Sequence, residues 1–270
     1  MLDVDGPLSD PTARRSTSAA VRDGVAELAL RGWLIAFNTG RALSSVRRMV
    51  LDPWSAELAP EARAALLEVL VVSCEKGAVM ASDFAGPAGA TSWVDPSLRV
   101  PQAVNDALRR LVAERFADVM MVDDAKQTMV SIEMLPELDG GIARYRAAQA
   151  AILPHVAAIV AAADGPRLQI EATIIAVDVE RGGPTGVSKA LGARRIVEAY
   201  GHQGLEVSRA VTIGDSASDV AMAVELRSVC GDVRHVHVGA EPVPSRGSRV
   251  EMAPSPYEAG TSWAVEGLLG

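Results

Sequence analysis

The feature of this sequence that most constrains its fold is a recurring pattern: a short apolar run ends in a polar loop, and a helical pattern follows. The runs span residues 33–37, 69–73 and 210–213, and they lead into Asn38-Thr-Gly-Arg41, Cys74-Glu-Lys-Gly77 and Gly214-Asp215. A continuous apolar run such as that at 33–37 is typical of a parallel strand buried on both faces. We therefore expect an α/β fold, in which helices cover a parallel sheet and ligands bind at the carboxyl ends of its strands.

Helical patterns fill the stretches between these runs. Residues 16–31 carry apolar side chains at helical spacing, and Gly32 ends the pattern. Further helices are expected at residues 43–49, 187–200, 217–224 and 263–269, a further strand at 234–238, and a Pro/Ser-rich surface loop at 242–256.

A segment of different character begins near residue 82. Its expected order is helix, strand, strand, helix and strand, at residues 102–115, 119–122, 129–134, 141–163 and 168–179. The helix at 141–163 is expected to be interrupted or kinked at Pro154, and residues 168–179 are expected to form one or two strands. This order predicts an antiparallel sheet with helices on one face, as an α+β insert. We therefore expect a core of residues 1–82 and 183–270 and an insert of residues 83–182, with Arg181-Gly-Gly-Pro184 as the return hinge.

The composition argues against several classes of protein. Apolar residues make up 49% of the chain and charged residues 22%, as in a globular protein. A net charge of −8 disfavours binding to nucleic acid or to an anionic membrane, and it is compatible with metal cations. The sequence has no apolar run of membrane-spanning length and no signal-peptide pattern. Cys74 and Cys230 are expected to be buried thiols, so we expect a cytoplasmic protein.

Two carboxylates close to the N-terminus, Asp3 and Asp5, are the first candidate functional residues. A strand would place both on the same side, and a turn at Gly6 and Pro7 would lift them out of the sheet. Carboxylates that are held close together repel, and a bound cation relieves the repulsion. Taken alone, Asp-Gly-Pro is more often an ordinary surface turn.

Further polar residues are expected at the same edge of the sheet. Thr39 and Gly40 follow one predicted strand, Asp215 and Asp219 follow another, and Lys189 lies in the first turn of a helix. Four carboxylates suit Mg²⁺, whereas a hydroxyl, a backbone N–H and an ammonium suit phosphoryl oxygens. One carboxylate can attack phosphorus, and another can transfer the protons.

These residues form four motifs that resemble those of the haloacid dehalogenase superfamily. The motifs are Asp3-Val-Asp-Gly6, Thr39-Gly-Arg41, Lys189 within Gly186-Val-Ser-Lys189, and Gly214-Asp-Ser-Ala-Ser-Asp219. They occur in the family's order and spacing. The resemblance implies a Rossmann-like parallel-sheet core, and the insert is similar to the type IIB cap of the Cof-like sugar phosphatases.

The resemblance also implies a role for each residue. Asp3 would be the nucleophile and a Mg²⁺ ligand, and Asp5 the general acid and base, with its backbone carbonyl on the metal. Thr39, Gly40, Arg41 and Lys189 would bind the phosphate, with Lys189 bridging it to Asp3. Asp215 and Asp219 would complete the metal site. For Arg41, the residues alone leave open a local ion pair or a role in fixing the Thr39 loop.

Three departures from the family pattern stand out. Pro7 replaces a threonine of the nucleophile loop, and Ser218 stands where many Cof-like members have asparagine. Only Met1 and Leu2 precede Asp3, where the family has a buried central strand. Either the start of the protein lies upstream or this strand is short, which would leave neighbouring backbone groups unpaired at about 1–3 kcal/mol each.

The expected function is therefore a Mg²⁺-dependent phosphatase that hydrolyses a small phosphate monoester, such as a sugar phosphate, through an aspartyl-phosphate. The alternatives are a phosphomutase of the phosphomannomutase type and a non-catalytic module of the same fold. The expected partner is a small phosphorylated metabolite, and neither nucleic acid nor a membrane is expected to be a partner. The protein is expected to be a monomer or a homodimer.

Other polar residues have simpler interpretations. Glu75 and Lys76 are expected to be a surface pair rather than substrate contacts. His235 and His237 alternate on one strand and are expected to be structural, because the histidines show no metal-ligand spacing.

Overall fold

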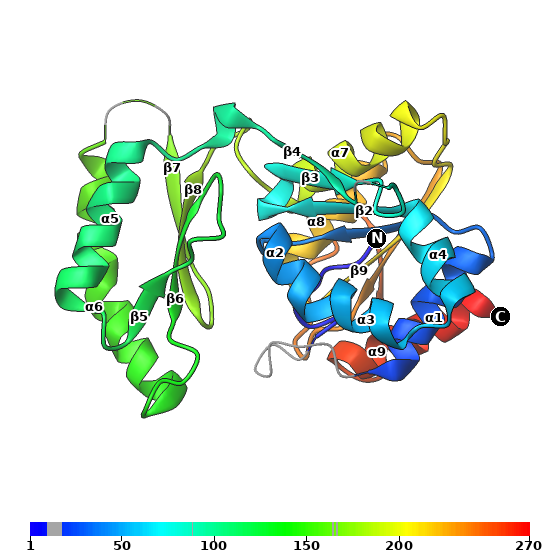
Figure 1. Cartoon of the computed structure of the whole chain (residues 1–270), viewed down its shortest axis with the longest axis horizontal. Coiled ribbons are helices and arrows are strands. Elements are labelled where there is room, and N and C mark those ends of the chain that lie inside the picture. The colour runs from blue at the N-terminus through cyan, green and yellow to red at the C-terminus, as the bar shows by residue number, and fades with distance from the viewer. Residues whose placement is uncertain (10–17, 88, 164, 166) are drawn as a thin grey trace. The chain divides into compact units, whose positions relative to one another are not determined.

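The computed structural model describes residues 1–9, 18–87, 89–163, 165 and 167–270 (Figure 1). These residues form two compact units, one comprising Met1–Trp93 and Ser188–Gly270 and the other Val94–Val187. Both boundaries lie later in the chain than residues 82 and 182, where the sequence pattern changes.

A mostly parallel sheet forms the centre of the first unit. Its strands are β1 (Ile35–Asn38), β2 (Leu70–Cys74), β3 (Val79–Ser82), β4 (Thr91–Val94), β9 (Arg209–Gly214), β10 (Asp232–His237) and β11 (Arg249–Met252). β1 pairs with β2, and β10 pairs with β9 and β11, all in parallel, whereas β3 runs antiparallel to β2. Every residue of β1 and β2 is buried, as expected for strands that are covered on both faces.

Three N-terminal residues join the two halves of this sheet. Leu2 lies between β1 and β9, parallel to both. Its backbone makes hydrogen bonds of 2.8 and 2.9 Å with β1, and Met1 and Asp3 each make one of 2.9 Å with Ile213 of β9. The strand order is therefore β4-β3-β2-β1-(Met1–Asp3)-β9-β10-β11. This short pairing sets Asp3 at the carboxyl edge of the sheet.

A cavity of about 270 Å³ lies beside this short central strand. Trp33 and Leu34 line it from the chain entering β1, and residues 208–211 line it from β9. The Met1 amine donates to the carbonyl of Val211 at 2.9 Å, and burial lowers the pKa of this amine from 8.0 to about 5. The cavity therefore occupies the place where a longer central strand would pair with its neighbours.

Two groups of helices cover the sheet. α1 (Ala19–Leu30) packs against α4 (Pro60–Val69) and α9 (Tyr257–Leu269), and α7 (Lys189–His202) packs against α8 (Ala217–Leu226). Figure 1 shows the two groups on opposite sides of the sheet. The chain from β1 to α4 forms α2 (Leu43–Val46), a π-helical turn (Arg47–Leu51) and α3 (Asp52–Glu57). The expected helix at 16–31 corresponds to α1, and its residues 16 and 17 lie outside the described residues.

The second unit is an antiparallel sheet with two helices on one face (Figure 1). Its elements are α5 (Gln102–Arg115), β5 (Met120–Val122), β6 (Val130–Met134), α6 (Gly141–Ala161), β7 (Leu168–Ala172) and β8 (Ala176–Arg181), with strand order β5-β6-β8-β7. Leu108 of α5, Tyr145 and Ile152 of α6, and Ile132 of β6 belong to one buried core. The order of elements is that of the expected insert, with residues 168–179 forming two strands, β7 and β8. The helix at 141–163 is not interrupted at Pro154, because α6 continues through this residue.

The structure corrects one expectation of local structure. Residues 242–256 do not form a loop throughout, because β11 (Arg249–Met252) pairs in parallel with β10. Four residues of an edge strand give too short a pattern to recognise within a Pro/Ser-rich tract.

No helix of the described residues has the length and apolar character needed to cross a membrane.

We predict that lengthening the central strand stabilises the protein. Four β-branched residues (Val-Ile-Val-Ile) added before Met1 replace a buried amine by paired backbone and fill the cavity. The free energy of unfolding in urea should rise by roughly 1–3 kcal/mol.

The same extension should change the dependence of stability on pH. Between pH 5 and 8 the unfolded chain keeps a proton on the Met1 amine that the folded chain has lost, so stability rises with pH. The extended chain should have a flatter slope over this range. An extension of Gly-Ser-Gly-Ser is the control, and equal stabilisation by both extensions would contradict the prediction.

Candidate active site

The candidate catalytic residues lie at the carboxyl edge of the first unit's parallel strands. Asp3 follows Leu2, Thr39 follows β1, and Asp215 follows β9. Asp3 is 7% exposed, and one of its oxygens accepts a hydrogen bond from the amide of Val4 at 2.7 Å. The nucleophile candidate is therefore held by both its backbone and its side chain.

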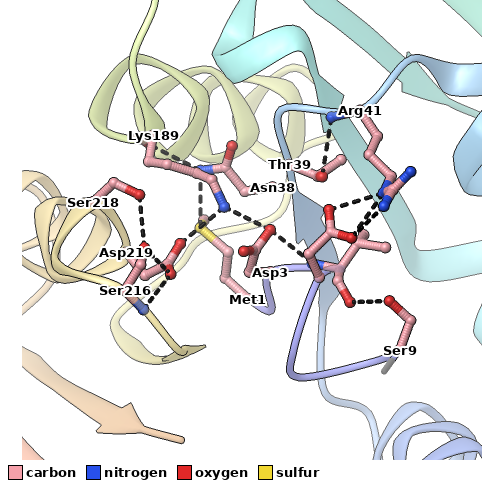
Figure 2. Close-up of polar contacts among 12 residues, drawn as sticks. Met1, Asp3, Ser9, Asn38, Thr39, Arg41, Lys189, Ser216, Ser218 and Asp219 are labelled. Carbon is pink, nitrogen blue, oxygen red and sulfur yellow. Dashed lines mark hydrogen bonds and ion pairs between the residues drawn. The ribbon is translucent and has the colours of Figure 1, made fainter. Parts of the chain in front are cut away.

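Lys189 lies between two carboxylates (Figure 2). Its Nζ is 2.5 Å from Oδ1 of Asp3 and 2.8 Å from Oδ1 of Asp219, and the side chain is 6% exposed. It is the first residue of α7, whose N-cap Ser188 accepts a bond from the amide of Leu191 at 3.0 Å. A cation is disfavoured at a helix N-terminus, so the two carboxylates compensate both the helix dipole and the burial.

Asn38 fixes the start of the helix that carries Lys189. Its Nδ2 donates to the carbonyl of Lys189 at 2.7 Å. α7 approaches β1 closely at Gly192, where a Cβ atom would lie 2.2 Å from Oδ1 of Asn38 and 2.5 Å from Oγ of Ser73. Any larger residue at position 192 would therefore displace α7. Asn38 was not among the predicted site residues, although a polar residue that ends an apolar run was a visible signal.

Both oxygens of Asp219 are occupied by protein donors. Oδ1 accepts from Lys189, and Oδ2 accepts from the amide of Ser216 at 3.0 Å and from its hydroxyl at 2.7 Å. Asp219 is fully buried, and it closes a capping box at the start of α8. Ser218, one of the departures from the family pattern, is exposed and bonds to Oγ of Ser216. The geometry makes Asp219 a support for Lys189 and for this loop.

A group of carboxylates suited to a divalent cation forms around Asp3. Asp3, Asp215 and Asp219 each offer an oxygen, and these oxygens lie within 4.8 Å of one another. Gly6 allows Asp215 to come close, because its φ is +86° and a Cβ atom there would lie 2.6 Å from Oδ2 of Asp215. Three hard oxygen ligands fit a magnesium site, because Mg²⁺ binds a few carboxylates together with water.

The charges of this group depend strongly on one another. Burial raises the pKa of Asp3, and Lys189 opposes that increase. Burial and Asp219 together raise the pKa of Asp215 to about 7. The pKa of Asp219 is lowered because its interactions with Lys189 and Ser216 outweigh its burial, and the pKa of Lys189 is raised by its two carboxylate partners against its own burial. The anionic form of the cluster is therefore costly without a cation.

Asp5 and Arg41 form a bidentate ion pair. Nε of Arg41 lies 2.9 and 2.8 Å from the two oxygens of Asp5, and Nη2 lies 2.5 Å from Oδ1. The amide of Arg41 donates to the hydroxyl of Thr39 at 3.1 Å, which shapes the loop around Gly40 (Figure 2). The side chain of Asp5 is thus engaged by Arg41 and is not part of the acidic group around Asp3.

The two histidines of β10 and Glu75, which the sequence analysis also considered, are buried. His235 and His237 are buried on β10, where they bond to the hydroxyl of Thr212 and to the carbonyl of Glu241, and burial lowers the pKa of His235 to about 4. The expectation that Glu75 lies on the surface is wrong, because its side chain is fully buried. A left-handed turn after β2 directs this residue inward.

We predict that divalent cation binding strengthens as the pH rises through 7. Asp215, whose pKa is about 7, must lose its proton to act as a ligand. Because about a tenth of the carboxyl is ionised at pH 6 and about nine tenths at pH 8, the Mg²⁺ affinity should be about tenfold higher at pH 8. The affinity is measured at each pH from the rise of the thermal unfolding midpoint as Mg²⁺ is added. An equal midpoint shift at both pH values, or an unaltered shift in Asp215→Asn, would contradict the prediction.

We predict that Gly6→Ala disrupts cation binding through Asp215. Gly32 is a matched control, because its φ of +84° is nearly the same but no atom lies within 4 Å of an added Cβ. Both variants should lose about 1–2 kcal/mol of stability, the cost of a left-handed backbone at alanine. Only Gly6→Ala should also lose the stabilisation by Mg²⁺. A similar Mg²⁺ response in the two variants would show that the contact with Asp215 does not matter.

Comparison of sequences gave no match to a protein-family model, and no match to a curated protein. Comparison of structures gave clear matches over 99% of the chain. The C-terminal domain of trehalose-6-phosphate phosphatase from C. albicans matches with a TM-score of 0.63, 14% identity and 90% of its length covered. A haloacid dehalogenase-like hydrolase from Bacteroides thetaiotaomicron matches with a TM-score of 0.61, 13% identity and 97% of its length covered.

A third match has the highest identity of the three but a lower TM-score. Trehalose-6-phosphate phosphatase from Aspergillus fumigatus gives a TM-score of 0.51, with 18% identity and 90% of its length covered. At such identities the matches report the fold. They confirm the architecture that the four motifs predict: this chain has the fold of the haloacid dehalogenase-like hydrolases.

Proposed function

We propose that this protein is a Mg²⁺-dependent phosphatase that hydrolyses a small phosphate monoester through an aspartyl-phosphate on Asp3. One observation carries the proposal. The carboxylate of Asp3 lies at the edge of the central strand, 2.5 Å from Nζ of Lys189 and grouped with Asp215 and Asp219. A nucleophile, a fixed cation and a set of metal ligands thus meet around one carboxylate, as phosphoryl transfer requires.

In the first step an oxygen of Asp3 attacks phosphorus and the ester oxygen of the substrate leaves. The hydroxyl of Thr39 and the amide of Gly40 would hold the phosphoryl oxygens, and the ammonium of Lys189 would offset the charge that develops on them. Asp5 would donate a proton to the leaving oxygen. Its pairing with Arg41 suggests that Arg41 orients the Asp5 side chain between its proton-transfer steps.

In the second step water attacks the phosphorus of the aspartyl-phosphate. Asp5, now a carboxylate, would accept a proton from this water, which releases phosphate and restores Asp3. Mg²⁺ held by Asp3, Asp215, Asp219 and the backbone of Asp5 would supply neutralisation of charge on the phosphoryl oxygens. The donor set fits this ion, since buried carboxylates with raised pKa values are stabilised by a divalent cation.

The two features that favoured a non-catalytic module leave this arrangement intact. The short central strand still makes hydrogen bonds on both sides of Leu2, and Pro7 is buried within the turn that follows Asp5. We propose the second unit as the cap that helps to select the substrate. A sugar phosphate is the first class to test, because trehalose-6-phosphate phosphatases are among the structural neighbours.

The proposal is tested with p-nitrophenyl phosphate and a panel of sugar phosphates in the presence of Mg²⁺. Asp3→Asn should lower turnover by at least about 10³-fold, because an amide cannot form the phospho-intermediate. A matched control is Asp23→Asn, which changes an acidic residue of α1 away from the site. Full activity of Asp3→Asn would exclude the mechanism, and transfer of phosphate to a sugar hydroxyl rather than to water would indicate a mutase.

A further inference from the structure

A buried asparagine, Asn38, links the strand that carries Asp3 to the helix that carries Lys189 (Figure 2). Asn38 ends β1 and is fully buried. Its backbone amide donates to the carbonyl of Leu2, the residue before Asp3, at 2.9 Å. Its side-chain Nδ2 donates to the carbonyl of Lys189 at 2.7 Å. One residue is thus bonded to both of the elements whose side chains meet at the candidate nucleophile.

The bond to Lys189 acts on the backbone from which the ammonium group projects. Lys189 is the first residue of α7, and its Nζ lies 2.5 Å from Oδ1 of Asp3 and 2.8 Å from Oδ1 of Asp219. The helix dipole opposes a cation at this end of a helix, so the dipole alone would favour moving the ammonium outward. A donor on the carbonyl of Lys189 holds its peptide group in place, and with it the direction in which the side chain leaves the helix.

The side-chain amide of Asn38 is only half satisfied. Among the described residues, no group donates a hydrogen bond to its Oδ1, although this atom is buried. Leaving a buried acceptor unpaired is costly, and an apolar side chain of similar shape would avoid that cost. A half-turn of the amide would place Oδ1 against the carbonyl of Lys189, so this carbonyl sets the orientation. The bond from Nδ2 is therefore what the asparagine contributes here.

Ser73 of β2 has the same surroundings as Asn38 but lacks this bond. It is the partner of Asn38 in the register of β1 and β2, it is equally buried, and its Oγ has no hydrogen-bond partner among the described residues. Both side chains face Gly192 of α7, where a Cβ atom would lie 2.2 Å from Oδ1 of Asn38 and 2.5 Å from Oγ of Ser73. A change at Ser73 therefore alters the packing against α7 without removing the donor to Lys189.

We propose that Asn38 is a positioning residue for phosphoryl transfer, because it holds the ammonium of Lys189 at the distance from Asp3 that the reaction requires. This inference rests on the proposed phosphatase function, in which Lys189 offsets the charge that develops on the phosphoryl oxygens. That charge is greatest in the transition state, so a misplaced ammonium lowers kcat more than it weakens substrate binding. Asn38 acts through Lys189 and not on the substrate.

The kinetic test compares Asn38→Leu and Asn38→Ala with the matched control Ser73→Ala. Leucine keeps the branched shape of asparagine without the donor, and alanine cannot overpack the site if leucine does. With p-nitrophenyl phosphate and Mg²⁺, both Asn38 variants should have a kcat about tenfold lower and a KM within about threefold of the unaltered protein. Ser73→Ala should stay within about twofold in both constants, because it leaves the bond to Lys189 in place.

A spectroscopic test observes the ammonium group directly and does not require activity. The chain has only three lysines, Lys76, Lys126 and Lys189, so their ammonium signals can be told apart in a ¹H–¹⁵N spectrum. The signal of Lys189 is identified by its absence from Lys189→Arg. Burial and pairing slow the exchange of ammonium hydrogens with water. This exchange should be at least about tenfold faster in Asn38→Ala and unchanged in Ser73→Ala.

Three outcomes would overturn the inference. One is a kcat within about twofold of the unaltered protein in Asn38→Ala, shown to be folded by thermal unfolding. Another is an equal loss of kcat in Ser73→Ala, which would assign the effect to packing against Gly192. The third is an unaltered exchange of the Lys189 ammonium in Asn38→Ala. If the unaltered protein has no phosphatase activity, the proposed function fails separately, and the exchange measurement alone decides whether Asn38 positions Lys189.

Discussion

A buried ammonium group between two carboxylates is the interaction on which the rest of the first unit depends. Lys189 begins α7, Asp3 ends the central strand, and Asp219 closes the first turn of α8, so one ion-pair network joins two helices and the sheet. Removing one member of such a network leaves an uncompensated buried charge, which typically costs 3–5 kcal/mol. The network also has a geometric effect, because it fixes the distance between the candidate nucleophile and the cation beside it.

The parallel sheet explains why residues so far apart in sequence meet at this place. The carboxyl ends of parallel strands share one edge, and the strands that lead to Asp3, Thr39, Glu75 and Asp215 all end there. Close approach of the loops then requires small residues at defined points. Gly6 lies against Asp215, and Gly192 brings α7 against β1. The backbone topology thus brings the candidate catalytic residues to one edge of the sheet, and side-chain contacts then hold them in place.

The sequence predicted most of this architecture because its signals are local. The strands β1, β2 and β9 are apolar runs, and α5 has a helical period that residues 102–115 show directly. α4 was not predicted, because it leads directly into β2: its last residue, Val69, was expected to begin the strand that starts at Leu70. The roles of Asn38 and of the turn at Glu75 could not be predicted. Their partners lie far along the chain, at a separation of 151 residues for the bond from Asn38 to Lys189.

The short central strand has a consequence for the order in which the protein folds. Leu2 pairs with Phe37 and with Ile213, so the two halves of the sheet are joined through contacts of very different sequence separation. The contact with β1 closes a short loop, whereas the contact with β9 must wait until the whole intervening chain has been brought back. The half built on β1 and β2 is thus placed to form early, and the N-terminus is the template on which the second half completes the sheet. The candidate active site contains residues from both halves of the sheet, so it would be among the last parts of the first unit to form.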